Sequence, residues 1–451
     1  MRTPEPAGLD TATPAVVFKL DPNVLHHGGL GLIRSLGRAG VPVYAVHEDP
    51  MAPAAHSRYL RGRWWWRPEL ADPERINLGL AALAEKLGRP AVLFPTDDAA
   101  AIHLAEHGAA LRHWFRFPDP PPELPREVAG KFTLQDVCRD LGIPTPRAEL
   151  VRTRAEAAEF AAETGYPLVA KLATPWTSGG RAKVRSTSIL RTPRDLRELG
   201  DAWDEQETEQ QRAGLLMLQE YVPGGSGNDW FFHAYRGSGG CRPAFTGVKL
   251  RSYPAHAGLT TLGRCLSNTV LRAQATELLR RLDFRGIADL DFRFDRRDGS
   301  YRLLDFNPRL GAQFRLFRDS AGIDVVLAAY LDLTGQPVPE GLPPVGRRFL
   351  VENYDPLGAV GYWRRGDLGL RQWVRSVWRA DELAWFARDD LAPFALMCGW
   401  MGRRALTRRF APRTGVQVVE PPRYRERIER DAGAAIRQRR RSPYAVEEGH
   451  R

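Results

Sequence analysis

The stretch Gly286-Ile-Ala-Asp-Leu-Asp-Phe-Arg-Phe-Asp295 is followed closely by Tyr301-Arg-Leu-Leu-Asp-Phe-Asn-Pro-Arg309. Both stretches alternate in a way that predicts two strands. Asp291 alternates with Leu290 and Phe292, and Asp305 alternates with Leu304 and Phe306, so each carboxylate leaves an apolar strand on one side. The pair Asp298-Gly299 between them is a turn signal. The sequence therefore predicts an antiparallel hairpin that sets Asp291 beside Asp305.

Two facing carboxylates repel each other, and burying them without a partner is costly. A divalent cation would remove that cost, because Asp291, Asp305 and Asn307 offer the hard oxygen ligands that Mg²⁺ accepts while it also binds phosphate oxygens. Arg309 could reach a phosphate or a carboxylate with its planar fork. The alternative is a solvated hairpin edge with scattered acids, and the Asp-x-Asn-Pro-Arg run after an apolar strand argues against it.

This hairpin resembles the metal-binding end of the ATP-grasp superfamily, and more closely its carboxylate–amine ligase branch, which includes D-aspartate ligase-like enzymes. The usual pattern there is an acid-Phe strand followed by Leu-Leu-(Glu/Asp)-x-Asn-Pro-Arg, and this chain has Asp at both acid positions. Asp shortens the reach without removing a ligand. The resemblance implies ATP and Mg²⁺ as cofactors, with one or two ions and with Mn²⁺ as a substitute.

The expected fold class is α/β. Residues 1–14 are expected to be disordered, and residues 15–125 read as βαβ units of a doubly wound parallel sheet, the pre-ATP-grasp domain on the substrate side. Its expected strands are 15–18, 41–46 and 91–94, its helices are 31–40 and 73–87, and Asp97 caps a further helix. A Pro-rich linker at 118–125 leads to a two-lobed α+β ATP-grasp domain at 126–335, with a lid at about 131–215 and a metal-binding lobe at about 216–335. Residues 336–451 form a Trp/Arg-rich, helical and basic C-terminal extension.

Lysine is rare in this chain, with six among 65 basic residues, so each lysine indicates a position where a compact ammonium is preferred. Lys171 ends an expected strand at 167–172. The small residues that follow, including Ser178, Gly179 and Gly180, could form a nest of backbone N–H groups for phosphates. The spacing is not that of a Walker A motif, and a plain surface loop is the alternative.

The resemblance also assigns roles to single residues. It implies that Lys131 and Lys171 hold the α- and β-phosphate oxygens of ATP. It further implies that Glu220 and the backbone of Tyr221 and Val222 bind adenine. Asp229 stands where the family often has an acid near the ribose or the metal.

Lys249 and Arg251 alternate along one expected strand and would share a face. Two cations there favour an anion between them, such as the γ-phosphate or an acyl phosphate, with a solvated strand as the alternative. With Arg309 they are the candidate catalytic residues. Their surplus positive charge predicts a small acidic substrate, an amino acid or a peptide-like precursor, which is joined to an amine.

The segment His27-Gly-Gly-Leu-Gly-Leu-Ile-Arg34 is similar to a dinucleotide fingerprint, but Arg34 stands where Gly or Ala is required. We therefore do not expect NAD(P) binding. By resemblance this domain lines the substrate site instead. The substrate-side candidates are His26, His27, Thr96 and Asp97, although a lone His is more often structural.

The extension interleaves tryptophans with arginines. The pattern favours helices that pack their tryptophans on the core, and an anionic membrane surface or stacking on nucleic acid are the alternatives. Nucleic acid is not expected as a partner, whereas peripheral membrane association stays open. The residues concerned are Trp363, Trp373, Trp378, Trp385 and Trp400, with Arg364, Arg365, Arg371, Arg375 and Arg379.

The formal net charge is +11, and much of the excess lies in the last fifty residues, where the arginine run 437–441 predicts disorder. No run approaches the ~18 apolar residues of a membrane span, and the N-terminus lacks an apolar signal segment, so a cytoplasmic protein is expected. The four cysteines show no spacing typical of a disulfide framework or a zinc site. The oligomeric state stays open.

Together these features predict an ATP-dependent carboxylate–amine ligase that forms an amide through an acyl phosphate and releases ADP and phosphate. Two alternatives stay open. One is a phosphotransferase that uses the same ATP clamp on a small stable acceptor. The other is a nucleotide-binding regulatory protein without turnover, which the intact Asp291, Asp305 and Asn307 argue against.

Overall fold

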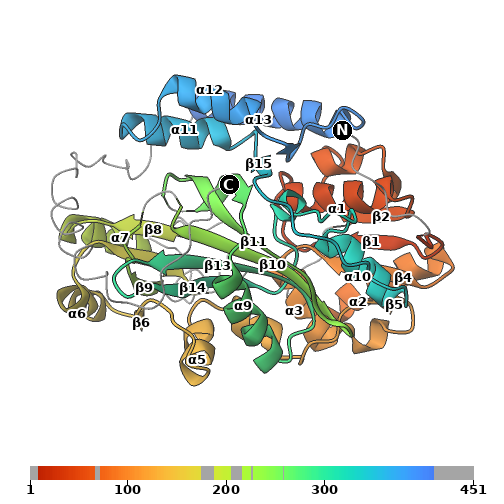
Figure 1. Ribbon diagram of the computed structural model, residues 1–451, viewed down its shortest axis with the longest axis horizontal. Helices are drawn as coiled ribbons and strands as arrows, with labels where there is room; N and C mark the ends of the chain where they lie inside the picture. The colour runs from red at the N-terminus through yellow and green to blue at the C-terminus, as the bar shows by residue number, and fades with distance from the viewer. Residues whose placement is uncertain are drawn as a thin grey trace.

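The computed structural model describes residues 9–66, 72–173, 187–204, 216–224, 227–256 and 258–410. Its described strands form three sheets of five, seven and four strands. Figure 1 shows the five-stranded sheet at the right, the four-stranded sheet at the left, the seven-stranded sheet between them and three helices across the top. No helix among the described residues is long and apolar enough to cross a membrane.

The N-terminal sheet has the strand order β3-β2-β1-β4-β5, and every neighbouring pair is parallel. Strand β1 is apolar and buried throughout, as expected for a parallel sheet covered on both faces. Ala15 and Val17 pack on the side of α1, whereas Val16 and Phe18 pack on the side of α2 and α3. The elements are β1 (Ala15–Phe18), α1 (His27–Arg38), β2 (Val43–His47), β3 (Leu60–Trp65), α2 (Pro73–Leu87), β4 (Ala91–Pro95), α3 (Asp98–His107) and β5 (Phe115–Arg116).

The parallel sheet is therefore confirmed. Residues 9–14, which we expected to be disordered together with residues 1–8, are placed against the core. The Tyr330 hydroxyl donates to the Thr13 carbonyl at 2.7 Å, and the Gln336 side chain bonds Asp10. The expectation was wrong for this part because the hydrogen-bond partners lie more than 300 residues away; residues 1–8 lie outside the described residues.

The four-stranded sheet, which lies in the part of the chain that we expected to form the lid, is antiparallel throughout, with the order β6-β9-β7-β8. Its small core is formed by Phe160 and by apolar strand residues such as Leu168 and Leu218. The elements from the linker onward are α4 (Leu124–Ala129), α5 (Thr133–Asp140), β6 (Ala148–Val151), α6 (Arg154–Thr164), β7 (Leu168–Leu172), β8 (Thr187–Leu190), α7 (Pro193–Asp204) and β9 (Leu216–Glu220).

The seven-stranded sheet has the order β14-β13-β10-β11-β12-β15-β16. The β13–β14 hairpin lies at its edge, and Asp291 is the register partner of Asp305, as predicted. One face of this sheet packs on α9 through residues such as Phe306 and Leu278. The elements are β10 (Asp229–Gly237), β11 (Gly240–Tyr253), β12 (Leu259–Cys265), α9 (Thr269–Arg281), β13 (Gly286–Asp295), β14 (Ser300–Asn307) and α10 (Val325–Leu333).

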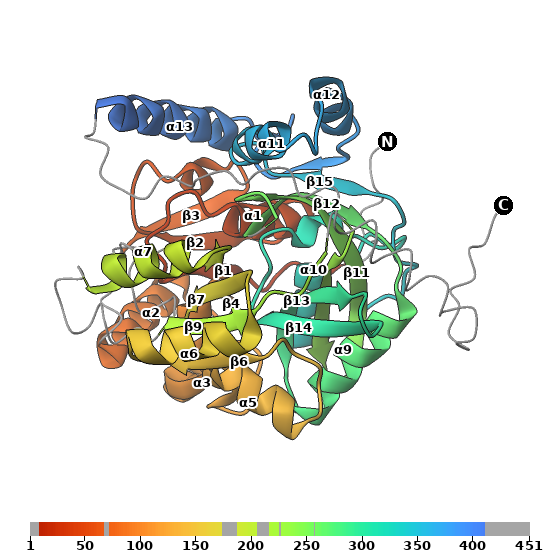
Figure 2. The same cartoon turned by 90° about the vertical axis from the view of Figure 1, so that its left-hand side faces the viewer.

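The C-terminal extension is part of this body and not a detached appendage. Two of its strands complete the large sheet, and its helices form one layer over one end of the molecule (Figures 1 and 2). Arg34 on α1 is fully buried and donates to the Asp390 carboxylate and to the carbonyls of Trp385 and Asp390. The elements are β15 (Arg348–Leu350), α11 (Asp355–Arg364), α12 (Leu370–Trp378), β16 (Glu382–Leu383) and α13 (Ala392–Phe410).

The tryptophans of the extension divide into two groups. Trp385 is buried, and the indoles of Trp373 and Trp400 donate hydrogen bonds to Asp355 and Met51. Trp363 and Trp378 are 65% and 84% exposed. The packing interpretation is therefore right for the first group and wrong for the second.

Candidate active site

The two facing carboxylates of the β13–β14 hairpin each bind ammonium groups. Lys131 and Lys171 donate to the same oxygen of Asp305, at 3.1 and 3.3 Å between Nζ and Oδ1. Lys249 donates to Asp291 at 2.8 Å between Nζ and Oδ2. Three of the six lysines of the chain thus converge on two adjacent acids.

These lysines come from three separate parts of the fold. Lys131 lies between α4 and α5, and its backbone N–H donates to the Ala173 carbonyl just after β7. Lys171 lies on β7 of the lid, and Lys249 lies on β11 of the large sheet. Ion pairs at the hairpin consequently join the expected lid to the large sheet.

Burial and charge act against each other in this cluster. Burial lowers the pKa of Lys171 below its usual value in spite of the Asp305 charge. For Asp305, burial favours the neutral form, but the charges of Lys131 and Lys171 outweigh it and hold its pKa well below the usual range. Burial raises the pKa of Asp291, and Lys249 offsets this only in part. The positive charge near Asp305 therefore compensates for its burial, whereas the positive charge near Asp291 does not.

A second carboxylate pair surrounds Arg309. Its Nε donates to Asp98 at the start of α3 at 3.0 Å, and its Nη2 donates to the Asn307 amide oxygen at 3.1 Å. Its Nη1 lies 3.6 Å from Asp289 on β13. Buried His233 lies 3.0 Å from Asp289 without the alignment of a hydrogen bond. Arg309 therefore connects the N-terminal domain to the β13–β14 hairpin.

The acids fit a magnesium ion that shares its coordination with phosphates. Within the described residues no group of three or more His, Cys, Asp or Glu side chains could hold a metal by itself. Mg²⁺, however, usually takes one or two carboxylates and completes its shell with water and substrate phosphates. Asp291 has one buried oxygen without a hydrogen-bond partner. The Asn307 oxygen accepts from Arg309 and retains a second lone pair.

The segment after β9 binds charged neighbours of its own. Glu220 pairs with Arg297 at 2.7 Å, and the Val222 carbonyl accepts from Arg293 at 3.0 Å. Arg293 also binds Asp229 through two hydrogen bonds, of 2.6 and 2.9 Å, and lies over the Tyr221 ring. Asp229 is thus held by an arginine and not directed at the lysine cluster. Ser178, Gly179 and Gly180 lie outside the described residues.

The structure does not bring Arg251 into the site. A β-bulge between Lys249 and Arg251 interrupts the strand register, so the two cations are not equivalent neighbours on one face. Both ends of the Arg251 fork bind Asp355 at 2.8 Å, and its Nη1 donates to Ser376. Its partner acid lies 104 residues further along the chain, so the absence of nearby acids in the sequence was misleading.

The four substrate-side candidates have structural partners. The His26 ring accepts from the Gly29 N–H at the start of α1, and the Thr96 hydroxyl donates to the Phe18 carbonyl. Asp97 accepts from the N–H groups of Leu20, Asp21 and Ala100, and burial raises its pKa to about 6. The His27 ring packs against Phe349 and Trp385.

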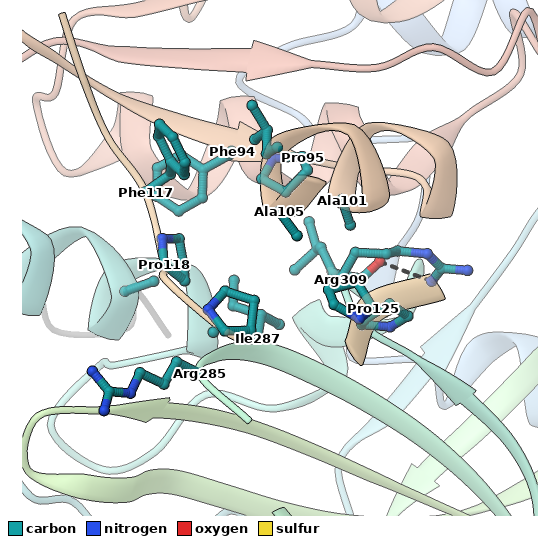
Figure 3. Close-up of a pocket in the computed structure, with 16 residues that line it drawn as sticks. Phe94, Pro95, Ala101, Ala105, Phe117, Pro118, Pro125, Arg285, Ile287 and Arg309 are labelled. Carbon is teal, nitrogen blue, oxygen red and sulfur yellow. Dashed lines mark hydrogen bonds between the residues drawn. The ribbon is translucent and has the colours of Figure 1, made fainter. Parts of the chain in front are cut away.

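A small cavity of about 40 Å³ lies beside Arg309, between the N-terminal domain and the start of β13. Figure 3 shows Phe94 and Phe117 on one side of it and Ile287 on the other. Its walls are mostly apolar, and of the cluster residues only Arg309 contributes to them. A cavity of this size and lining does not suit a nucleotide.

Sequence reasoning missed several residues of the site. Asp289 could have been found, because it precedes Asp291 by two positions and therefore shares its face of the strand. Asp98 could not, because 211 residues separate it from Arg309. The arginines that hold Asp229 and Glu220, Arg293 and Arg297, belong to the same hairpin but carry no distinctive motif.

Comparison with known proteins gives a consistent result. No family model matches the chain. The chain is 25% identical over 321 residues to the N-terminal section of the carbamoyl phosphate synthase large chain of Methanopyrus kandleri, a match that covers 67% of the chain and 52% of the relative. It is 34% identical over 94 residues, 21% of the chain and 25% of the relative, to a D-alanine–D-alanine ligase of Pseudomonas fluorescens. The chain spans about half or less of the length of these relatives.

Solved structures share its fold. One is the ADP complex of PurK, an N5-carboxyaminoimidazole ribonucleotide synthetase, with a TM-score of 0.56, 14% identity, and coverage of 79% of this chain and 86% of that one. Another is the biotin carboxylase domain of the Hydrogenobacter thermophilus 2-oxoglutarate carboxylase in complex with MgADP and bicarbonate, with a TM-score of 0.54, 16% identity, and coverage of 74% and 72%. The similar proteins are ATP-grasp enzymes of the carboxylate–amine ligase type, so the resemblance is confirmed and the fold is the ATP-grasp fold.

Proposed function

We propose that this protein is an ATP-dependent carboxylate–amine ligase, which forms an amide through an acyl phosphate and releases ADP and phosphate. The observation that carries the proposal is the convergence of Lys131, Lys171 and Lys249 on the facing Asp305 and Asp291. A cluster of this kind, between a lid and a sheet, suits a triphosphate with its metal.

Each group of the cluster has a distinct role in the proposal. Lys131 and Lys171 hold the α- and β-phosphate oxygens, and Lys249 neutralises the γ-phosphate. Asp291, Asp305 and Asn307 would hold one or two Mg²⁺ ions, with Mn²⁺ as a substitute, and the metal would neutralise the β- and γ-phosphates. Glu220 and the backbone of Tyr221 and Val222 would receive adenine, and Ser178, Gly179 and Gly180 would cover the phosphates.

The chemistry then needs positioning and not a protein nucleophile. An oxygen of the substrate carboxylate attacks the γ-phosphorus, which gives the acyl phosphate and ADP. The amine nitrogen attacks the acyl carbon, phosphate leaves from that carbon, and the departing phosphate takes the proton that the nitrogen loses. Arg309 would orient the carboxylate, because its guanidinium lies where the N-terminal domain meets the hairpin.

The proposed substrates are a small acid, such as an amino acid or a peptide-like precursor, and an amine. Arg309 and Lys249 are partly exposed and could receive an anion, since each is 14–19% accessible at its side chain. Arg251 is left out of the catalytic group, because Asp355 already neutralises it. The proposed location is the cytoplasm, where ATP is available.

The test is a screen for ADP release by the purified protein with Mg²⁺, single amino acids and small amines. We expect release that depends on one acid, and a hydroxamate of that acid when hydroxylamine replaces the amine. ADP release together with a stable phosphorylated acceptor and no hydroxamate would assign the chain to the phosphotransferases. ATP binding without release under any acid would favour the regulatory protein.

A further inference from the structure

Two side chains of helix α12, Trp373 and Ser376, form hydrogen bonds to the rest of the protein. The Trp373 indole donates to Asp355 at 2.9 Å, and Arg251 donates to the Ser376 hydroxyl at 2.7 Å. No residue of this helix is buried. A surface helix usually directs its whole apolar stripe at the core.

In α12, one row of apolar side chains faces solvent instead. Leu370, Val374 and Trp378 are four residues apart and therefore share one helix face, and they are 69%, 40% and 84% exposed. The neighbouring helix α11 adds a second set of apolar side chains that are 40% exposed or more, Leu357, Val360 and Trp363. A row of exposed apolar side chains such as that of α12 is typical of an interaction site.

Positive charge borders this stripe. Arg371, Arg375 and Arg379 each follow one of the stripe residues, so they form a parallel row about 100° around the helix, and all three are exposed. Residues 370–378 include no acid. The nearest flanking acids are engaged elsewhere: Asp367 bonds His256, and Asp381 accepts from the Arg348 N–H.

We propose that the α11–α12 face binds the surface of an anionic lipid bilayer, with α12 lying in the plane of the interface. The apolar row would enter the boundary between headgroups and acyl chains, and the arginine row would bind lipid phosphates. Trp378 suits this role, because an indole prefers the wet edge of an apolar layer.

Charge argues against two other occupants. A second copy that used the same face would set one arginine row against the other, and like charges at close range repel. A nucleic acid would pair with the arginines, but it would leave Leu370 and Val374 exposed to its charged backbone. A bilayer with anionic headgroups complements both rows at once.

The test uses the full chain and sedimentation with vesicles of phosphatidylcholine, with or without about one quarter of phosphatidylglycerol. The variant Leu370→Ser/Val374→Ser/Trp378→Ser removes the apolar row. The control, Leu78→Ser/Leu342→Ser/Val345→Ser, removes three apolar side chains elsewhere on the surface that are 70–77% exposed. Because each of the six side chains is at least 40% exposed, both variants should keep a melting temperature close to that of the parent.

We expect the parent and the control to bind the anionic vesicles, and the α12 variant to bind them at least about tenfold more weakly. Arg371→Glu/Arg375→Glu/Arg379→Glu should abolish the preference for anionic lipid. Equal vesicle binding by the parent and the α12 variant would overturn the proposal, because the binding would then depend on basic sequence elsewhere in the chain. The proposal would also be overturned if the parent did not bind vesicles but formed a dimer or an oligonucleotide complex that the α12 variant did not form.

Discussion

Asp305 accepts two ammonium groups on one oxygen, and the effect of substituting it follows from that arrangement. Asp305→Asn keeps the shape but removes the negative charge that faces Lys131, Lys171 and the proposed metal. We expect Mg²⁺-dependent ADP release to fall by about two orders of magnitude or more, with the fold retained. The control is Asp298→Asn on the exposed turn of the same hairpin, and steady-state ADP release is the measurement. Turnover of Asp305→Asn within about twofold of the parent contradicts the assignment.

A substitution of Lys171 can distinguish the effect of its charge from the effect of its packing. Lys171→Met keeps the apolar stem and removes the ammonium, so we expect the Kd for ATP to rise about tenfold or more, since a charge-assisted hydrogen bond contributes about 1.5–3 kcal/mol. Thermal stability should change little, because the removed charge is already disfavoured by burial. Calorimetry with Lys86→Met as control is the measurement. Equal ATP affinity in parent and variant argues against a phosphate contact.

The positions of some site residues could be predicted from the sequence, because a chemically distinctive residue type stands at a regular position in a strand or is rare in the chain. Alternation along one strand placed Asp291 opposite Asp305, and the scarcity of lysine drew attention to Lys131, Lys171 and Lys249. The role of Arg251 was not predictable, because a bulge and a distant acid decide it. Period-two arguments fail at a bulge, which shifts one side chain out of register.

At the scale of elements, the Arg251–Asp355 pair fastens β11 to α11, and Trp373 joins it from α12. Arg251→Leu leaves the Asp355 carboxylate buried without its partner, so we expect a loss of about 3–5 kcal/mol in unfolding free energy and an unchanged Kd for ATP. Arg251→Leu/Asp355→Leu should recover part of the loss. Denaturant unfolding provides the numbers. If Arg251→Leu weakens ATP or acid binding at parental stability, Arg251 belongs to the site after all.

One helix and one strand with a regular apolar pattern were predicted with correct bounds. The start of a glycine-rich helix and an edge strand were not predicted correctly. The helix 73–87 and the strand 15–18 have the expected bounds. Helix α1 begins at His27 and not at Gly31, because the His26 side chain caps the glycine run and Gly31 packs closely on Phe314 and Arg315. Strand β3 was missed, since it lies at the sheet edge with alternate residues exposed.

At the level of the whole molecule, long-range contacts determine where the C-terminal extension packs, which local sequence patterns did not predict. The extension contributes two strands to the large sheet and binds α1 through the buried Arg34–Asp390 pair. The Arg34–Asp390 pair joins residues 356 positions apart, so no local pattern predicts it. Loss of the extension should therefore expose His27 on α1, because the His27 ring packs against Phe349 and Trp385 of the extension.

Buried histidines predict acid sensitivity. Burial lowers the pKa of His47 from 6.5 to about 3 and that of His27 and His103 to about 4. The unfolded chain is then protonated first, so stability is complete above about pH 6.5 and falls as the pH drops toward 4. Asp97, with its raised pKa of about 6, acts in the opposite direction over pH 6 to 4 and offsets part of the loss.

We therefore expect a lower Tm at about pH 5 than at about pH 7, with His47 alone contributing about 2 kcal/mol. His47→Gln should make the Tm profile flatter, whereas His113→Gln, which changes an exposed residue, should not alter it. Scanning calorimetry across this range is the measurement. Parallel profiles for the parent and His47→Gln would show that His47 is not neutral in the fold.

In the proposed reaction, the cluster of Asp305, Asp291 and the three lysines activates a carboxylate with ATP. Once the screen has identified the acid, its carboxylate can be labelled with ¹⁸O and the released phosphate analysed by mass spectrometry. A carboxylate oxygen that attacks the γ-phosphorus must leave with phosphate, so we predict one ¹⁸O atom in the phosphate for each amide formed. Unlabelled phosphate at the same rate of ADP release would contradict the account, because ATP would then be hydrolysed without acyl phosphate formation.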